Sequence, residues 1–344
     1  MRCAKRGITL TTGDKFEIIA ELLEQGDNRL SVKTLCEIAG VSRSGYYRWT
    51  SAAQKRAERE QRDERDFRAI QRAYEYRGYP KGARTIQMCM LHWDEPVLMN
   101  LKKIRRLMTK YGLICPIRKA NPYRRMAKQL KDNRYVKNEL QRAFKEFGPR
   151  KVLLTDITYL PYNGKFAYLS TILDAYTRQV LAYVVSDSLE LDFVLDTVNM
   201  AVEKYGMELD AQTLIHSDQG CHYTSKTFQQ LVADKHLRQS MSRRGNCWDN
   251  APQESLYGHM KDEIDLSGCQ SFQDVQAVIE DWMDYYNNER GQWDLAKLAP
   301  NEYYEYITTG DYPLEGIVTP NDRVGKVFAE ANVLKTVQAN LCSL

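Results

Sequence analysis

Three carboxylate residues occupy positions at which a carboxylate needs a reason. Asp156 lies in the middle of the apolar run "LLTDITYL", and aspartate is poorly suited to a strand interior. Asp218 ends the run "TLIHSD" just before Gly220, and an unpaired charge at the exit of a core strand is costly. Glu254 lies in "WDNAPQESLYGHMKDE", a predicted helix whose first turn suits Pro252. Together the three predict a shared site for a cation.

The chemistry of such a site follows from its ligands. Neighbouring carboxylates repel one another unless a cation is present, and ligands that are all oxygens suit Mg²⁺ or Mn²⁺ rather than zinc. Two such ions roughly 4 Å apart can activate a hydroxyl nucleophile and stabilise the leaving oxygen of a phosphodiester. We therefore predict that Asp156, Asp218 and Glu254 are catalytic residues that bind two Mg²⁺ ions, for which Mn²⁺ substitutes. Each residue alone is better explained as a turn, strand or helix residue, but the three together are not.

A mixed α/β sheet is predicted to position these residues. The run 151–162 reads as a strand, and Asn163-Gly164 is a strong hairpin turn. If this strand and the later strand 213–218 are neighbours, Asp156 and Asp218 can face each other. Antiparallel strands followed by alternating helices and strands predict helices on both faces of the sheet. After the hairpin turn we expect strands 165–177 and 179–188, helix 190–205, strand 213–218, helix 225–236, strand 238–242, and helices 248–264 and 271–289.

The predicted helix around Glu254 carries a further charge on the same face. Gly258 and Lys261 follow Glu254 at helical spacing, and Asn250 precedes it by about one turn. We predict that Lys261 holds a DNA phosphate beside the scissile bond, that Gly258 leaves room for a close backbone approach, and that Asn250 contacts DNA. The alternative is a surface lysine paired with one of the acidic residues that follow it.

The charge of the chain is divided between its two halves. The 344 residues carry a net charge of +4. Residues 1–150 hold 34 Lys and Arg against 17 Asp and Glu, a net charge of +17, whereas residues 151–344 hold 15 against 28, a net charge of −13. A basic first half suits nucleic acid. No apolar run of about 18 residues predicts a membrane span, and the scattered cysteines without a secretory signal predict a reducing cytoplasm.

The segment "SVKTLCEIAGVSRSGYYRW" (31–49) has the spacing of a helix-turn-helix. A first helix is expected to end at Gly40, and Ser42 is a good N-cap for a second. A plain packing pair of helices is the alternative interpretation. The residues predicted to close one small core are Leu35, Ile38, Val41, Tyr46 and Trp49. The residues predicted to point outward and contact DNA are Arg43, Ser44, Tyr47 and Arg48.

A second basic region follows a charged connecting helix, 51–77. Helices are predicted at 82–92 and 98–112, and the later one has an apolar stripe opposite five cations with no acidic residue between them. That pattern favours phosphate contact. The cations are Lys102, Lys103, Arg105, Arg106 and Lys110. Residues 116–150 read as a basic linker that can lie on nucleic acid, and its predicted DNA-binding residues are Arg118, Lys119, Arg124 and Arg125.

These motifs together resemble the transposases of the IS3 family of bacterial insertion sequences. The matching segments are "DITYL", "HSDQGCHYTS" and "SMSRRGNCWDNAPQESLYGHMKDE", which surround the three carboxylates. Between Asp218 and Glu254 lie 35 residues, as in the DD(35)E signature, and Lys261 matches a basic residue often found seven positions after the glutamate. The resemblance runs from about residue 30 to residue 305. It implies an RNase H-like core similar to that of retroviral integrases.

The resemblance also implies what the protein does. We expect a DNA transposase that binds terminal inverted repeats and target DNA as a homo-oligomer of at least two subunits, in the bacterial cytoplasm and associated with the nucleoid. It would cleave DNA at the ends of the element and transfer the freed 3′-OH to another phosphodiester. Two alternatives stay open: a metal-dependent DNA nuclease without strand transfer, and a DNA-binding regulator derived from a transposase.

The expected fold is an RNase H-like α/β core, a mixed five-stranded sheet flanked by helices, preceded by an all-α helix-turn-helix DNA-binding region. The predicted domains are a helix-turn-helix domain (1–50), the connecting helix (51–77), a second helical DNA-binding region (78–115), the basic linker (116–150), the catalytic core (151–290) and a C-terminal tail (291–344).

Overall fold

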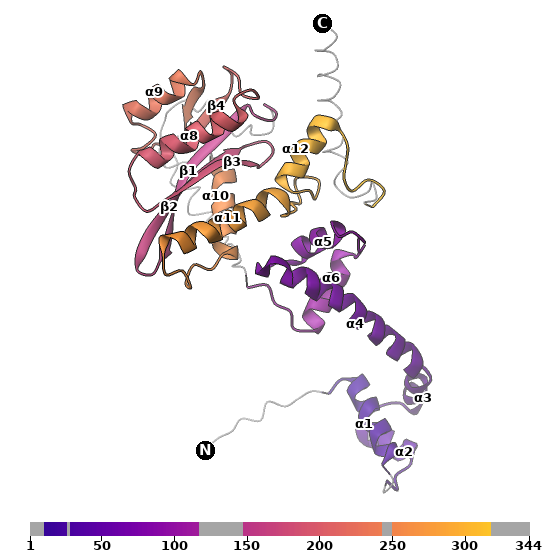
Figure 1. The fold of residues 1–344 in the computed structure, drawn as a ribbon. Helices are drawn as coiled ribbons and strands as arrows, with labels where there is room; N and C mark the ends of the chain where they lie inside the picture. Colours follow the sequence, from indigo (N-terminus) through magenta and orange to yellow (C-terminus); the bar gives the residue numbers. More distant parts are fainter. Residues whose placement is uncertain (1–9, 26–27, 117–146, 243–249, 318–344) are drawn as a thin grey trace, which may run out of the picture. The chain divides into compact units, whose positions relative to one another are not determined.

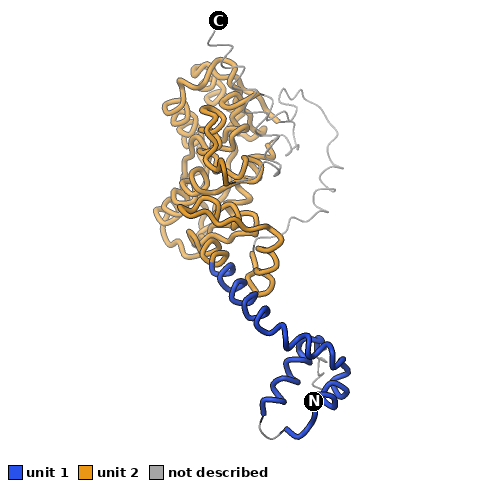
Figure 2. Tube along the Cα trace, turned by 90° about the vertical axis from the view of Figure 1, so that its right-hand side faces the viewer, with its two compact units in different colours: residues 1–68 blue, residues 69–344 orange. Residues whose placement is uncertain are grey.

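The chain forms two compact units, Met1–Arg68 and Ala69–Leu344 (Figure 2). The boundary falls within one long helix, α4 (Ala53–Glu75). The structure is a computed structural model that describes residues 10–25, 28–116, 147–242 and 250–317.

The first unit consists of helices around a small apolar core. Ser42 caps the third helix as predicted, because its hydroxyl oxygen accepts a hydrogen bond from the Gly45 amide at 3.1 Å. Gly40 ends the second helix with a φ of 65°, a left-handed conformation that glycine adopts without steric cost. The helices are α1 (Thr12–Glu24), α2 (Val32–Ala39) and α3 (Arg43–Ser51), followed by α4. The buried core residues are Phe16, Ile19, Leu35, Cys36 and Tyr46.

One residue predicted to belong to this core is at the surface. Ile38 is 72% exposed, so its predicted burial is wrong. Leu35 and Cys36 face the core from α2, and a residue two positions beyond Cys36 points roughly 200° away around the helix. The apolar stripe of α2 therefore includes Val32 and Ala39, which are partly buried against the core, and leaves Ile38 outside.

The second unit begins with a helical region that packs on the later helix α11 (Phe272–Asn288). Arg77 forms ion pairs with Asp281 at 3.0 Å and with Glu289, and the Tyr79 hydroxyl donates to Asp281. The elements of this region are the 3₁₀ turn η1 (Tyr76–Gly78), α5 (Ala83–Leu91) and α6 (Leu101–Lys110). The predicted apolar stripe of α6 is buried at Ile104, Leu107 and Met108.

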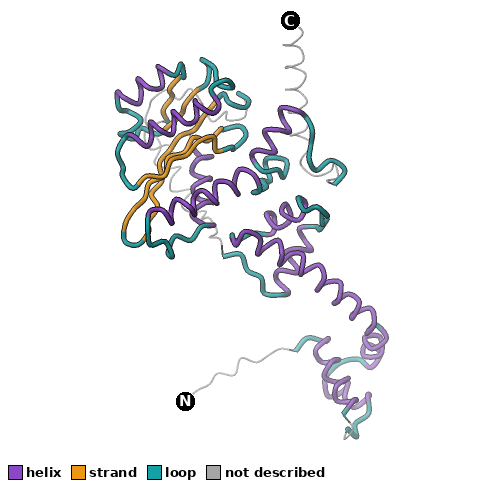
Figure 3. The backbone as a smooth tube through the Cα atoms, in the orientation of Figure 1, coloured by secondary structure: helices purple, strands orange, loops and turns teal. Residues whose placement is uncertain are grey.

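A mixed five-stranded sheet forms the centre of the second unit (Figure 3), as predicted. Its strand order is β3-β2-β1-β4-β5; β1, β2 and β3 are antiparallel neighbours, and β4 and β5 continue the sheet in parallel. Asn163 and Gly164 form the predicted turn, with φ values of 40° and 71°. The strands are β1 (Val152–Tyr162), β2 (Lys165–Asp174), β3 (Val180–Ser186), β4 (Leu214–Ser217) and β5 (Arg238–Met241).

Helices cover both faces of this sheet (Figure 1). On one face α10 (Ala251–Glu263) and α11 pack against Val152 and Leu154 of β1. On the other face α8 (Asp192–Tyr205) and α9 (Lys226–Asp234) pack against Leu153. Because successive strand residues point to opposite faces, the even-numbered Asp156 lies on the face that α10 covers.

A helix that the sequence analysis did not assign lies beyond residue 290. It is α12 (Pro300–Thr309), and Pro300 occupies its first turn. Its residues Tyr303 and Tyr306 belong to a buried cluster that also contains Tyr176, next to the end of β2. Part of the predicted tail is therefore packed into the second unit.

Candidate active site

The pairing of β1 with β4 brings Asp156 and Asp218 to the same level of the sheet. The two strands are parallel, and Leu154 is the partner of His216. Extending this parallel pairing by two residues along each strand puts Asp156 opposite Asp218. Asp218 follows the last residue of β4, where its Oδ1 accepts a hydrogen bond from the Gly220 amide at 2.8 Å. The sheet therefore supplies two of the three predicted carboxylates from adjacent strands.

Glu254 lies in the first turn of α10, with Pro252 in the same turn as predicted. Glu254, Gly258 and Lys261 are all exposed, and helical spacing places them along one side of α10. An added Cβ at Gly258 would meet no atom within 4 Å. This side of the helix is therefore open between Glu254 and Lys261.

The electrostatics of Asp156 connect these residues. Burial raises the pKa of Asp156 to about 7. The Ile157 amide, from which its Oδ1 accepts a hydrogen bond at 2.8 Å, lowers the pKa, while the charges of Asp218 and Glu254 raise it and Lys261 lowers it. Burial lowers the pKa of Lys261, and the charge of Asp156 opposes that shift. The charges of Asp218, Glu254 and Lys261 therefore all act on Asp156.

The chemistry of this donor set fits a hard divalent cation. The side chains are carboxylates, and oxygen ligands are those that Mg²⁺ prefers. Asp156 is partly buried, whereas Asp218 and Glu254 are exposed. Within the described residues, no three His, Cys, Asp or Glu side chains are close enough together to hold a metal ion.

A buried chain of hydrogen bonds fixes α10 to the sheet at Asp156. The Tyr257 hydroxyl donates to the backbone carbonyl of Asp156 at 2.6 Å and lies 2.9 Å from the Thr171 hydroxyl, which in turn accepts from the Gln253 side chain. Thr171 is the β2 partner of Asp156. Because Gln253 and Tyr257 flank Glu254 along α10, these bonds set the position of the glutamate relative to the strand that carries Asp156.

One part of this hydrogen-bond chain has a signal in the sequence. The two-residue turn Asn163-Gly164 fixes the hairpin register. Asp156 lies seven residues before Asn163, and Thr171 lies seven residues after Gly164. The pairing of Asp156 with Thr171 could therefore be derived from the sequence, whereas the contact with Tyr257 required the position of α10.

The far end of α10 is anchored by a buried ion pair. Arg290 Nη2 lies 2.7 Å from Glu263 Oε1, and Trp282 Nε1 donates to Glu263 at 3.0 Å. Glu263 is therefore engaged away from Lys261. Lys261 itself has no ion pair with any residue in the described part of the chain, so the structure does not support the alternative in which an adjacent carboxylate holds it.

The predicted DNA-binding residues differ in their exposure. Arg43, Ser44, Tyr47 and Arg48 are all exposed on α3, as are Lys102, Arg105, Arg106 and Lys110 on α6, whereas Lys103 is half-buried. Asn250 is 5% exposed, so a DNA contact would require its side chain to leave its buried position. The linker residues Arg118, Lys119, Arg124 and Arg125 lie outside the described residues.

Comparison with known families defines the class of the protein. Residues 146–247 and residues 235–300 each match an integrase core domain family, and residues 61–121 match an HTH-like domain family. The HTH-like match covers α5 and α6, the region predicted as the second helical DNA-binding region. The chain is therefore an enzyme of the integrase-core class that acts on DNA phosphodiesters, and this class is metal-dependent.

Curated relatives narrow the assignment. The chain is 31% identical over 206 residues to the putative transposase InsK for insertion sequence element IS150 of Escherichia coli, which covers 60% of this chain and 71% of that protein. It is 31% identical over 212 residues to a transposase-like protein of Haemophilus influenzae, and the match covers 61% of this chain and 94% of that protein. It is 27% identical to an IS600 protein of Shigella sonnei, and that match covers 79% of this chain and 97% of that protein. The chain belongs to the IS3 family of insertion-sequence transposases.

Among solved structures, the chain is similar in part to a simian T-cell lymphotropic virus intasome in complex with a PP2A regulatory subunit. It is 14% identical and has a TM-score of 0.41, and the match covers 65% of this chain and 73% of that chain. A magnesium complex of the HTLV-2 integrase catalytic core is 13% identical and has a TM-score of 0.34, and the match covers 45% of this chain and 96% of that chain.

None of the helices in the described ranges is long and apolar enough to cross a membrane.

Proposed function

We propose that this transposase binds the terminal inverted repeats of an insertion sequence, cleaves DNA at the element ends and transfers the freed 3′-OH ends to new DNA. Asp156, Asp218 and Glu254 are its proposed catalytic triad. The observation that carries the proposal is the parallel pairing of β1 with β4, which puts Asp156 and Asp218 at the same level of adjacent strands. Asp156 comes from β1, Asp218 follows β4 and Glu254 comes from α10. In support, β1 pairs with β4, and the Tyr257 hydroxyl of α10 donates to the Asp156 carbonyl.

Two Mg²⁺ ions are the proposed cofactor, and Mn²⁺ is expected to substitute for them. Asp156, Asp218 and Glu254 would hold the metal. When bound, it would neutralise charge on the attacking and leaving oxygens of the phosphodiester. Asp156 must lose its proton before it can act as a ligand, and its pKa in the metal-free protein is about 7. Metal binding is therefore expected to release a proton near neutral pH.

The proposed reaction has two steps, hydrolysis at the element end and transfer of the freed 3′-OH to target DNA. In the first, the oxygen of water attacks the phosphorus at the element end and the bond from phosphorus to the 3′ oxygen breaks, which leaves a 3′-OH and a 5′-phosphate. In the second, that 3′ oxygen attacks a target phosphorus, and the target strand leaves with its own 3′-OH. Lys261 would bind the phosphate next to the scissile bond as a point charge, and Gly258 would allow the DNA backbone to approach α10.

DNA recognition is assigned to the basic first part of the chain. Exposed residues of α3 and α6 would contact the inverted repeats, and the cations of α6 would mainly contact phosphates. The protein is expected to act as a homo-oligomer of at least two subunits on DNA. We place it in the bacterial cytoplasm, in association with the nucleoid.

The triad is tested by three variants, Asp156→Ala, Asp218→Ala and Glu254→Ala. Each removes a metal ligand and leaves the DNA-binding surface intact, so cleavage and joining should fall by roughly a thousandfold or more while the affinity for end DNA stays near wild type. Glu203→Gln is a matched control, because Glu203 is exposed on α8 on the opposite face of the sheet. Wild-type turnover in any alanine variant would remove that residue from the triad.

A second substrate separates a transposase from a nuclease. An end duplex that already carries a free 3′-OH needs no cleavage step. The proposal expects this duplex to be joined to target DNA in the presence of Mg²⁺. Cleavage of intact ends without joining of the pre-cleaved duplex would instead identify a nuclease.

A further inference from the structure

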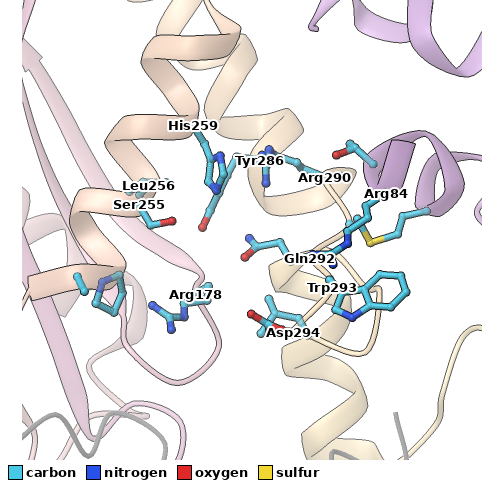
Figure 4. A pocket seen from close by; sticks show the side chains of 16 residues that line it. Arg84, Arg178, Ser255, Leu256, His259, Tyr286, Arg290, Gln292, Trp293 and Asp294 are labelled. Carbon is cyan, nitrogen blue, oxygen red and sulfur yellow. The ribbon is translucent and has the colours of Figure 1, made fainter. Parts of the chain in front are cut away.

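A cavity of about 440 Å³ lies beside the proposed active site. It is bounded by α5, the turn between β2 and β3, α10 and the segment that follows α11 (Figure 4). Its volume is within the range of sites that bind small molecules, roughly 300–1,000 Å³. Ser255 and His259 line it from α10, and Ser255 directly follows Glu254 in the chain. A ligand in this cavity would therefore contact the helix that carries the proposed catalytic glutamate.

Arg178 is the most unusual residue of the cavity. It lies in the turn between β2 and β3 with a φ of 62°, and a non-glycine residue in this conformation is strained. Burial lowers the pKa of its guanidinium, although the nearby Tyr286 and Asp294 oppose that shift. The side chain makes no hydrogen bond or ion pair with any residue that the structure describes. A partly buried arginine that is held in a strained turn and has no hydrogen-bond or ion-pair partner among the described residues is suited to receive an anionic ligand.

Other charges in the cavity leave an excess of positive charge. Arg84 enters from α5, on the opposite side from Arg178 (Figure 4), and lies 5.3 Å from the ring of Trp293. Arg290 is already neutralised by Glu263. Asp294 is the single carboxylate among the described lining residues. Two arginines therefore face one carboxylate, which favours a ligand with a phosphate group.

The remaining surface of the cavity suits an aromatic group. Trp293 and His259 offer ring faces, and the side chains of Ser255 and Gln292 offer hydrogen-bond donors and acceptors. Bases of nucleic acids stack on aromatic and guanidinium surfaces, and polar side chains bind their edges. A bound phosphate alone would use the arginines and make no use of the His259 ring or of the polar side chains of Ser255 and Gln292. The lining therefore matches a complete nucleotide.

We propose that this cavity holds a single nucleotide that is unstacked from the end DNA, with its phosphate on Arg84 and Arg178 and its base against Trp293 and His259. The inference rests on the proposed function, because the strand that supplies the nucleotide is the substrate of the active site. Extracting one nucleotide costs stacking and pairing energy, and the cavity offsets that cost. Because α10 carries both His259 in the cavity and Glu254, the captured nucleotide orients the adjoining phosphodiester relative to Glu254.

The test measures base unstacking with 2-aminopurine, whose fluorescence increases when it leaves the stack. The probe is placed at successive positions of an end duplex and mixed with the full-length protein in Ca²⁺, so that no chemistry is needed. We expect a several-fold rise at one position with wild-type protein. Arg178→Gln, Arg84→Gln and Trp293→Leu should each remove most of that rise, while end affinity changes by less than about threefold. Lys226→Gln, which removes an exposed cation at the start of α9, should leave the rise intact.

The outcomes separate this inference from the proposed function. No rise at any position, or a full rise in all three cavity variants, overturns the cavity assignment even if cleavage and joining are normal. A normal rise in protein that neither cleaves nor joins in Mg²⁺ retains the cavity and overturns the proposed chemistry. A parallel titration with dAMP identifies the source of the nucleotide. Saturable dAMP binding that needs Arg178, without any 2-aminopurine response, would assign the cavity to a free nucleotide and overturn the DNA version. Melting temperatures show whether each variant is folded. Because three independent substitutions are used, misfolding of one variant does not decide the result.

Discussion

Helix α3 of the first unit and helix α10 of the second both expose basic residues, but they are held in place by different forces. α3 rests on a small apolar core that includes Phe16 and Tyr46. α10 is fixed in addition by the Tyr257 hydrogen bonds and the Glu263–Arg290 ion pair. Apolar burial is non-directional, whereas hydrogen bonds restrict both distances and angles. Recognition requires a stable surface, while chemistry requires carboxylates at fixed separations.

The largest effect that tests this contrast is expected in α3. Arg43→Ala combined with Arg48→Ala removes two exposed cations and should lower the affinity for end DNA by about a hundredfold, at roughly 1–3 kcal/mol for a specific contact. Cleavage at saturating DNA should stay near wild type, because neither residue contributes to the second unit. Binding titrations and single-turnover cleavage measure the two quantities separately. A fall in the saturated cleavage rate that matches the loss of affinity would contradict the separation of roles.

A smaller effect is expected at Lys261 on α10. Lys261→Ala should reduce joining roughly tenfold, since a charged phosphate contact is worth about 1.5–3 kcal/mol at most, and should leave end affinity and folding near wild type. Lys261→Arg should restore part of the activity because it keeps the charge. End cleavage and joining are measured separately, with Lys226→Ala as the control for loss of a cation. Joining at the wild-type rate in the alanine variant would make Lys261 an ordinary solvated residue.

Tyr257→Phe tests whether directional bonds position Glu254. Loss of the hydroxyl removes its bonds to Thr171 and to the Asp156 carbonyl, so we expect about a fivefold loss of cleavage and a higher Mg²⁺ concentration for half-maximal activity. Tyr312→Phe is a matched control, because its hydroxyl donates to the Ala296 carbonyl at 2.8 Å in a buried cluster away from α10. Both variants should lose similar stability, roughly 1 kcal/mol. An equal change in Mg²⁺ dependence in both would reduce Tyr257 to a purely structural residue.

The smallest effect concerns the pH dependence of stability in EDTA. The pKa of Asp156 is about 7 in the folded protein and about 3.9 in an unfolded chain. The folded state therefore binds this proton more tightly, and the residue reduces stability as the pH rises from about 4 to 7. Asp156→Asn should raise the stability of the metal-free protein at pH 8 by about 1 kcal/mol after solvent screening, with little change at pH 4. Chemical denaturation at pH 4 and pH 8 measures the stability change caused by Asp156→Asn. An equal change at both pH values would rule out the raised pKa of Asp156.

Much of the sheet and its carboxylates could be predicted from sequence because the signals are local. The Asn163-Gly164 turn and the apolar runs indicate β1, β2 and their register, and the isolated Asp156 is conspicuous among strand residues. Asp218 and Glu254 were recognised from their positions at the ends of elements and from a family resemblance. Their roles in chemistry stay a prediction, while the strand order that makes Asp156 and Asp218 neighbours is confirmed.

Other features could not be predicted because they depend on contacts between distant segments. Arg178 reads as an ordinary turn arginine until α5 and α10 enclose it. Tyr257 reads as one more apolar helix residue until it reaches the Asp156 carbonyl. Ile38 is a different case: its hydrophobic character alone predicts burial, but the 3.6-residue period of α2 places it outside the buried stripe. Helix α12 lies in the segment predicted as a tail, and its Tyr303 and Tyr306 pack in a cluster with the distant Tyr176.

The shared register of β1 and β4 has a consequence for how such a chain tolerates insertions and deletions. Turns and helices between the two strands can absorb a gained or lost residue, because strand pairing does not depend on the length of the connection. A residue gained between Val152 and Asp156 has no such outlet, since a shift of one position moves a side chain to the opposite face of the sheet. The carboxylate would then point into the apolar layer beneath α8, beside Leu153 and Ile172. Insertions and deletions are therefore expected in the connections between strands. The five residues from Val152 to Asp156 must keep their number for Asp156 to stay on its face of the sheet.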